Sequence, residues 1–398
     1  MAFDRSFFGC LGRGGEEEPE EEEQTESPQR RGGGGGPAVN LGSLSLEDLS
    51  RALAKTHLHA FTLDELKAVT KNFSTINFLR EGRLGPVYKG FVDGGELRRP
   101  GLEAQHVAVR YLYSDDVQEE HREWLAEVVY LGTLIHPHLV NLVGFCDEDE
   151  HRMLVYEYMP GGSLETHLFK RDALAPSLPW LTRLKIAVGA AKGLCFLHEA
   201  DTPVIYGEFK TSNILVDSNK WRFQDYTAKL SNFGLEKEGQ QVGSPHPGYR
   251  APETFELTEA TAKSNVYNFG VVLLELLTGR RSVDEWRGGP ERNLVFWAWP
   301  HLGRGDKLHH IMDRSLERRY STRAAHKVAQ VAHRCLQHMP KSRPCMRDVV
   351  DALEPLLVLD DDVLPPPMVD DSEGAGCSSA AAADNTGGGD DNEPTQGN

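Results

Sequence analysis

Apolar residues recur with two different spacings along the chain, and the change of spacing divides it into two halves. In residues 104–113, Val107 and Val109 alternate with small or polar neighbours, which is typical of a half-buried strand. Similar short segments lie around glycines at 79–90 and at 152–159. The first half is therefore predicted to be rich in β-structure.

Beyond residue 161 the spacing becomes helical. From Leu184 to Cys195, apolar residues return every three or four positions, which indicates an amphipathic helix. The stretch 266–279 is apolar nearly all round, so we expect it at the centre of a helical half. Residues 328–335 carry another stripe that is expected to face the core.

Two helices are expected to accompany the strands. Ordered structure is predicted to begin near 61–73, where Thr62 and Glu65 have the spacing of a capping box. A second helix is predicted at 116–132, because its apolar residues share one face. The chain is therefore expected to belong to the α+β class.

Charge gathers at the two ends of the chain. The formal net charge is -17; residues 1–50 contribute -7 (11 acids, 4 bases) and residues 359–398 contribute -10 (10 acids, no base). The middle is therefore balanced, which gives no reason to expect nucleic-acid binding. Acidic and glycine-rich runs bury too little apolar surface to offset chain entropy, so we predict disorder in 1–55 and 358–398.

The region 56–357 is expected to fold, with a small lobe at about 73–159 and a larger lobe at about 160–357. The sequence has no apolar run of 18 residues and no secretory leader pattern. Its six cysteines are scattered without a C-x-x-C pair, which fits a reducing compartment better than a disulfide or zinc framework.

Short motifs occur in a fixed order along this region. A glycine-bearing turn is followed by V-A-x-[KR] at 107–110, by Glu127 on a helix, by a loop with Lys210 and Asn213, then by x-F-G and A-P-E. That order is the signature set of protein kinases. The glycine turn alone is weak support, whereas the ordered combination is specific.

More narrowly, the chain resembles plant receptor-like cytoplasmic kinases. The stretches 123–169, 183–206 and 269–287 are similar to that family almost throughout, for example "FGVVLLELLTGRRSVDEWR". The resemblance covers about 61–357. It implies a bilobal protein-kinase fold, with a β-rich N-lobe plus one helix and a larger α-helical C-lobe. It also implies a soluble Ser/Thr kinase fold that works beneath receptor kinases at the plasma membrane.

The departures from that family cluster on the chemistry. Its G-x-G-x-x-G loop is "REGRLG" here, in which Gly82 and Gly85 remain and Arg80 replaces the first glycine. Glycines let the backbone approach phosphates closely. A guanidinium at this position either crowds or crosses the nucleotide, or points to solvent.

Arg110 stands where the family has the lysine that pairs the α/β-phosphates and the helix glutamate. Arginine suits a carboxylate well but is bulkier than lysine. We therefore expect a structural ion pair with Glu127, with a phosphate contact as the alternative.

The family's catalytic loop Y-R-D-F-K-x-S-N reads "YGEFKTSN" at 206–213. Glu208 occupies the place of the catalytic aspartate, and a misplacement of ~1 Å can cost about 10²-fold in rate. Gly207 removes the arginine that grips a phosphorylated activation loop. Lys210, the implied γ-phosphate contact, and Asn213, the implied second metal ligand, remain. Loop scaffolding is the alternative role for both.

Asn232 replaces the metal-binding aspartate in front of Phe-Gly. Mg²⁺ prefers anionic oxygens, whereas an amide offers a neutral carbonyl of the same shape. Loss of one preorganised electrostatic group commonly costs ~10²–10³ in rate. Asn213 and Asn232 are therefore expected to form a weak metal site or none.

The resemblance implies a nucleotide site whose lining is retained. Its implied residues are Gly82, Gly85, Val87, Ala108, Arg110, Glu127, Tyr156, Met159 and Leu215. Met159 is implied to offer hinge backbone hydrogen bonds. We expect weak, metal-independent ATP binding at most.

Positions outside the chemistry follow the family more closely. Glu253 and Arg343 keep the implied structural ion pair, and Asn265 replaces the aspartate that tethers the catalytic loop. The segment before A-P-E is short and leaves Ser244 and Tyr249 as hydroxyl acceptors for phosphorylation.

The selective loss of chemistry favours a pseudokinase that scaffolds or regulates an active kinase or receptor complex. The alternative is a weakly active Ser/Thr kinase that transfers the ATP γ-phosphate to protein hydroxyls. A receptor kinase or another kinase is the expected partner. The insertion at 220–226, with Trp221 and Phe223, is either a variable loop or a partner contact.

Membrane attachment is only weakly specified. Ala2 excludes N-myristoylation, and a single acyl chain on Cys10 would anchor only marginally. We expect a cytoplasmic protein with at most peripheral association at the plasma membrane.

Overall fold

The computed structural model describes most of the region that the sequence predicts to fold. The described residues are 46–82, 85–95, 97, 101–112, 120–148, 151–169, 177–200, 203–207, 209–217, 226–231, 246–255, 260–303 and 305–359. All of them belong to the larger of two compact units, which spans residues 40–398.

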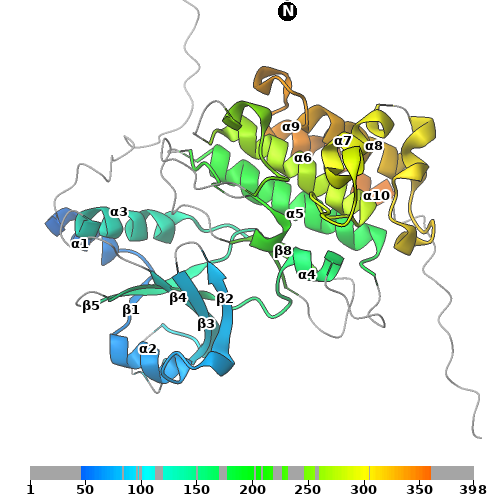
Figure 1. Cartoon of the computed structure of the whole chain (residues 1–398). Coiled ribbons are helices and arrows are strands. Elements are labelled where there is room, and N and C mark those ends of the chain that lie inside the picture. The colour runs from blue at the N-terminus through cyan, green and yellow to red at the C-terminus, as the bar shows by residue number, and fades with distance from the viewer. Residues whose placement is uncertain are drawn as a thin grey trace, which may run out of the picture. The chain divides into compact units, whose positions relative to one another are not determined.

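A six-stranded sheet forms the first part of the fold (Figure 1). Its strands are β1 (His59–Ala60), β2 (Phe78–Gly82), β3 (Gly85–Val92), β4 (Gln105–Leu112), β5 (Leu142–Glu148) and β6 (His151–Glu157). They lie in the order β1-β5-β6-β4-β3-β2, with β1 parallel to β5 and every other pair antiparallel. The strands predicted from alternation at 104–113 and 152–159 are confirmed as β4 and β6.

One face of the sheet is covered by α2 (Leu63–Thr70). Val107 and Val109 are fully buried in this layer together with Leu66 of α2. The predicted capping box is present, because Thr62 accepts a hydrogen bond from Glu65 N at 3.1 Å and Glu65 accepts one from Thr62 N at 2.8 Å. The alternating residues of the strands therefore point to the opposite face.

The helix α3 (Glu120–Thr133) lies where a helix was predicted at 116–132, and α1 (Leu46–Leu53) packs against it (Figure 1). Composition predicts disorder up to residue 55, whereas α1 already begins at Leu46. An acidic, glycine-rich composition masks a short helix that is stabilised by tertiary packing.

The second part of the fold is helical. Its helices are α4 (Leu164–Phe169), α5 (Trp180–His198), α6 (Ala262–Thr278), α7 (Leu294–Leu302), α8 (Thr322–Cys335), α9 (Met346–Leu353) and α10 (Leu356–Leu359). A short hairpin of β7 (Ile214–Asp217) and β8 (Thr227–Leu230) lies against α5. As predicted, α6 is buried along nearly its whole length, and α5 and α8 turn their apolar stripes to the same core. None of the helices in the described part of the chain is both long and apolar enough to cross a membrane.

A substitution at Gly144 on β5 tests how closely β1 packs on the sheet. A Cβ at this position would lie 2.1 Å from the His59 carbonyl oxygen and 2.6 Å from the Phe61 ring. We predict that Gly144→Ala destabilises the fold by about 1–3 kcal/mol, because β1 must move away from β5. Chemical denaturation measures the change. Gly288→Ala is the matched control, since no atom lies within 4 Å of its Cβ position; equal stability of the two variants would contradict the prediction.

Candidate functional site

The sheet face opposite α2 gathers residues that the resemblance assigns to the nucleotide. Residues directly opposite each other on neighbouring strands share a face. Val87 on β3 pairs with both Arg80 on β2 and Arg110 on β4. Arg110 pairs in turn with Leu154 on β6. These four residues form a row across four strands, which we call the arginine row.

Other residues of the implied nucleotide site lie next to this row. Ala108 pairs with Tyr156, and both side chains are half-buried. Met159 follows β6 and is buried, and its carbonyl accepts a hydrogen bond from Gly162 N at 3.2 Å. The Gly162 carbonyl accepts from β7 at 2.9 Å, which places Leu215 beside the same turn. The structure thus brings these positions together at the end of β6.

The glycine turn keeps one position where only glycine fits. Gly85 has φ +130°, and a Cβ there would lie 1.9 Å from the Tyr111 carbonyl oxygen. The surroundings of Gly82 lie outside the described residues, although its backbone ends β2. Close passage of β3 along β4 therefore depends on Gly85.

Arg80 reaches from the sheet to the helical part of the fold. Its Nη1 donates a hydrogen bond to Asn213 Oδ1 at 3.3 Å. Of the two alternatives for this residue, crossing the site is the one observed. Burial lowers the pKa of Arg80, and the charge of Arg110 lowers it further. Burial also lowers the pKa of Arg110, which is 5% exposed.

Asn213 is held both by Ser231, which directly follows β8, and by its own loop. Its carbonyl oxygen accepts hydrogen bonds from Ser231 N and Ser231 Oγ, both at 3.0 Å. The hydroxyl of Tyr206 donates to the Ser231 carbonyl. Lys210 is half-buried, and its carbonyl accepts from Asn213 N at 3.0 Å. Ser231, which precedes Asn232, is therefore hydrogen-bonded directly to Asn213, the implied metal ligand.

Asn265 on α6 holds the start of the catalytic loop. Its Oδ1 accepts from Tyr206 N at 2.8 Å, and its Nδ2 donates to Tyr206 O at 2.6 Å. His198 Nε2 lies 3.2 Å from the same oxygen. The predicted tether is therefore present, and it is made without a charged group.

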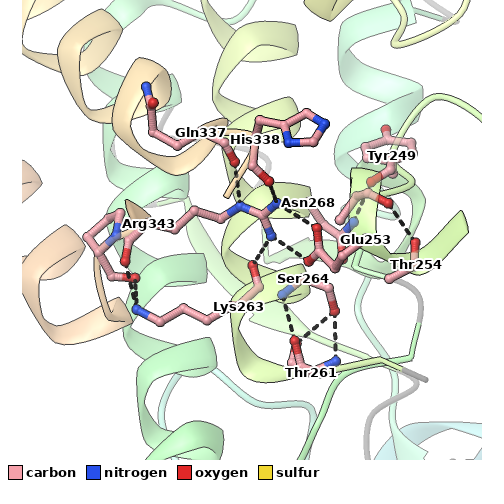
Figure 2. A network of polar contacts seen from close by, with 12 residues as sticks. Tyr249, Glu253, Thr254, Thr261, Lys263, Ser264, Asn268, Gln337, His338 and Arg343 are labelled. Atoms are coloured by element: carbon pink, nitrogen blue, oxygen red, sulfur yellow. Dashed lines mark hydrogen bonds and ion pairs between the residues drawn. The ribbon is translucent and has the colours of Figure 1, made fainter. Parts of the chain in front are cut away.

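Arg343 holds the A-P-E segment to the C-terminal helices (Figure 2). Its Nη1 and Nη2 each donate to one carboxylate oxygen of Glu253 at 2.6 Å. Its remaining donors bind the carbonyls of Lys263, Gln337 and His338 at 2.7–3.0 Å. The predicted ion pair is confirmed, and its arginine is buried with satisfied donors.

Tyr249 is not an accessible hydroxyl, which corrects one expectation. It is buried, its hydroxyl donates to Glu275 Oε2 at 2.5 Å, and Thr211 Oγ1 lies 3.0 Å away. Glu275 also accepts from Ser282 N at 2.8 Å. Phosphorylation of Tyr249 would require this network to open. The other predicted acceptor, Ser244, lies outside the described residues.

Five further positions singled out from the sequence lie outside the described residues. They are Glu208, Asn232, the side chain of Glu127, Trp221 and Phe223. The ion pair between Arg110 and Glu127 therefore stays a prediction.

The described residues do not fit a divalent cation at this site. The oxygen that the resemblance assigns to a metal, Asn213 Oδ1, is neutral and already accepts from a guanidinium. Within the described ranges, no three His, Cys, Asp or Glu side chains are grouped so that they could hold a metal. The expectation of a weak or missing magnesium site stays a prediction, because Asn232, the other implied ligand, lies outside the described residues.

Two residues of the site escaped the sequence analysis. Ser231 binds through its backbone and hydroxyl, and nothing in its local pattern indicates that contact. Glu275 is a carboxylate among apolar residues in the second half of α6. A charged residue in such a stretch is rarely buried without a partner, and that signal could have identified it.

Glu253→Ala tests the A-P-E anchor. Removal of one partner leaves Arg343 buried without its counter-charge, so we predict a loss of about 3 kcal/mol in the free energy of unfolding. Urea denaturation measures the loss. Arg51→Gln, which breaks an exposed pair with Asp48, should leave the transition unchanged; a Glu253→Ala transition at the same midpoint would refute the anchor.

Glu275 predicts a pH dependence of stability. Burial raises the pKa of its carboxyl to about 7 from 4.5, although Tyr249 and Ser282 donate hydrogen bonds to it. The folded protein therefore binds a proton that the unfolded chain releases between these values, so stability falls as pH rises through the window. We predict a decrease of up to about 3 kcal/mol. Urea denaturation from pH 4.5 to 8 should show this slope reduced in Glu275→Gln; equal slopes would contradict it.

Comparisons with known proteins agree with this architecture. A profile of the protein tyrosine and serine/threonine kinase family matches residues 73–353. An EPD1-interacting receptor-like cytoplasmic serine/threonine-protein kinase 5A of Gossypium barbadense is 56% identical over 319 residues, covering 78% of this chain and 67% of the relative. A relative from Nicotiana benthamiana, an EPD1-interacting receptor-like cytoplasmic serine/threonine-protein kinase, is 54% identical over 322 residues (79% and 67%).

The serine/threonine-protein kinase PBL13 of Arabidopsis thaliana is 53% identical over 318 residues, covering 78% of this chain and 62% of the relative. These matches span both the sheet and the helical part. The bilobal fold and the resemblance stated from the motifs are thereby confirmed. The chain belongs to the protein tyrosine and serine/threonine kinase family, among the receptor-like cytoplasmic kinases.

Proposed function

We propose that this protein is a slow serine/threonine protein kinase that acts in cytoplasmic signalling. From the sequence alone, a weakly active kinase is the alternative to a pseudokinase. The names of the relatives favour it, because proteins more than half identical to this chain carry the name of serine/threonine-protein kinases. The expectation of a protein without enzyme activity has no support from these relatives.

The catalytic-loop frame is the observation that carries this proposal. Asn265 fixes Tyr206 at the start of the loop, and Ser231 fixes Asn213 at its end. Lys210 lies between these two anchors and is retained from the family. A frame held at both ends preserves the positioning on which phosphoryl transfer mainly depends.

The proposed reaction transfers the γ-phosphoryl group of ATP to a protein hydroxyl. The hydroxyl oxygen bonds to phosphorus, the bond from phosphorus to the bridging oxygen of ADP breaks, and the hydroxyl proton passes to the carboxylate of Glu208. Lys210 would neutralise charge on the transferred group. The longer Glu208 side chain places its carboxylate less well than aspartate, so the rate is expected to be reduced about 10²-fold.

A catalysis-independent regulator is the second candidate. The contact between Arg80 and Asn213 favours it, because this hydrogen bond occupies an oxygen on which the family's chemistry depends. Asn232 in the sequence adds a second neutral position. In this role the chain would bind a receptor kinase or another kinase and modulate it, with at most peripheral membrane association through Cys10.

A transfer assay separates the two candidates. Purified full-length protein is incubated with radiolabelled ATP and a generic protein substrate, with Lys210→Ala as the inactive control. We predict slow incorporation on serine and threonine that the control lacks. The triple variant Arg110→Lys, Glu208→Asp, Asn232→Asp is expected to raise the rate by about 10²-fold or more. Incorporation by the wild type no greater than by Lys210→Ala would reject the kinase and leave the regulator.

A further inference from the structure

Arg80 places a positive charge at the position where the family's chemistry would use a metal cation. Its guanidinium, carried by β2, donates to the amide oxygen of Asn213 in the helical part. Among the described residues, no carboxylate forms an ion pair with it. A cation already held by this oxygen repels a second cation at the same place.

The register of the sheet adds a second guanidinium. Arg80 and Arg110 both face Val87 across the strand ladder, so their side chains leave the same face of the sheet. Strands are spaced about 4.8 Å apart, which separates the two Cα atoms by about 10 Å. Each side chain is long enough to bring its charged group toward the space between them.

Both arginines are partly or wholly removed from water. Arg110 is 5% exposed, Arg80 is half-buried, and burial lowers the pKa of each. The charge of Arg110 acts unfavourably on Arg80. An anion that contacts Arg80 offsets this unfavourable interaction.

We propose that this face binds a nucleoside triphosphate as the metal-free polyanion, with Arg80 in the place of the divalent cation and Arg110 beside it. The inference rests on the ATP site of the proposed function but not on transfer. A guanidinium presents planar paired donors that match phosphate oxygens. On triphosphate binding, Arg80 exchanges the neutral oxygen of Asn213 for an anionic one, which is the stronger hydrogen bond. A divalent cation then gains nothing, because its implied ligands are neutral amides.

Calorimetric titration of the full-length protein tests this inference. ATP is titrated in excess EDTA and again in millimolar Mg²⁺, and adenosine is titrated in EDTA. We expect ATP affinities that agree within about threefold with and without the metal, and adenosine at least about tenfold weaker than metal-free ATP. Equal affinity for adenosine and ATP, or ATP binding only with Mg²⁺, would overturn the inference.

Variants of Arg80 make the test specific. Arg80→Gln is expected to weaken metal-free ATP binding by about tenfold or more, because a charge-assisted hydrogen bond is lost. It should leave adenosine binding unchanged. Arg80→Lys should bind metal-free ATP with an affinity between those of the wild type and Arg80→Gln, since it keeps the charge but loses the paired donors. Lys67→Gln on α2, at the other face of the sheet, is the matched control and should bind as the wild type does.

The binding and transfer experiments together show which of the two proposals fails. Metal-free ATP binding without phosphate transfer keeps this inference and rejects the kinase proposal, whereas magnesium-dependent binding with transfer does the reverse. Thermal unfolding without ligand shows whether Arg80→Gln is folded. If Arg80→Gln is unfolded, the test rests on Arg80→Lys and on the comparison of ATP with adenosine. An Arg80→Lys protein that binds ATP as tightly as the wild type does counts against the inference.

Discussion

A buried amide on the central helix governs the geometry of the site. Asn265 is fully buried on α6 and satisfies both backbone groups of Tyr206. Because α6 is enclosed by the core, this contact ties the loop that ends at Asn213 to the buried interior of the helical part. The resemblance implies an aspartate at this position. Asparagine keeps the acceptor and adds a donor, so hydrogen bonding without charge is sufficient to set the loop.

The substitutions in this chain divide along a physical boundary. Positions that are anchored by several hydrogen bonds keep the family residue or an isosteric one, as Arg343 and Asn265 show. Positions that would touch phosphate or metal change charge or length, as at Arg80, Arg110 and Asn232. We expect the first set to matter for folding and the second for nucleotide chemistry.

Much of the fold could be predicted from spacing alone. The alternation around Val107, the capping box at Thr62 and the apolar stretch of α6 are local signals that the structure confirms. The helix α1 could not be predicted, because it is only eight residues long and packs on α3, a contact that no local pattern reports. The direction of Arg80 was also undetermined, since its partner Asn213 is 133 positions away and no local pattern reports such a contact.

Helices and buried side chains are already present before the region that the family profile covers. That profile starts at residue 73, whereas Leu66 of α2 and Phe61 are already buried in the sheet layer. A recombinant fragment trimmed to the profile would strip the cover from Val107 and Val109 and present a bare apolar surface to solvent. Such a fragment would tend to aggregate for reasons unrelated to its nucleotide chemistry. Expression boundaries for this protein therefore belong upstream of α1.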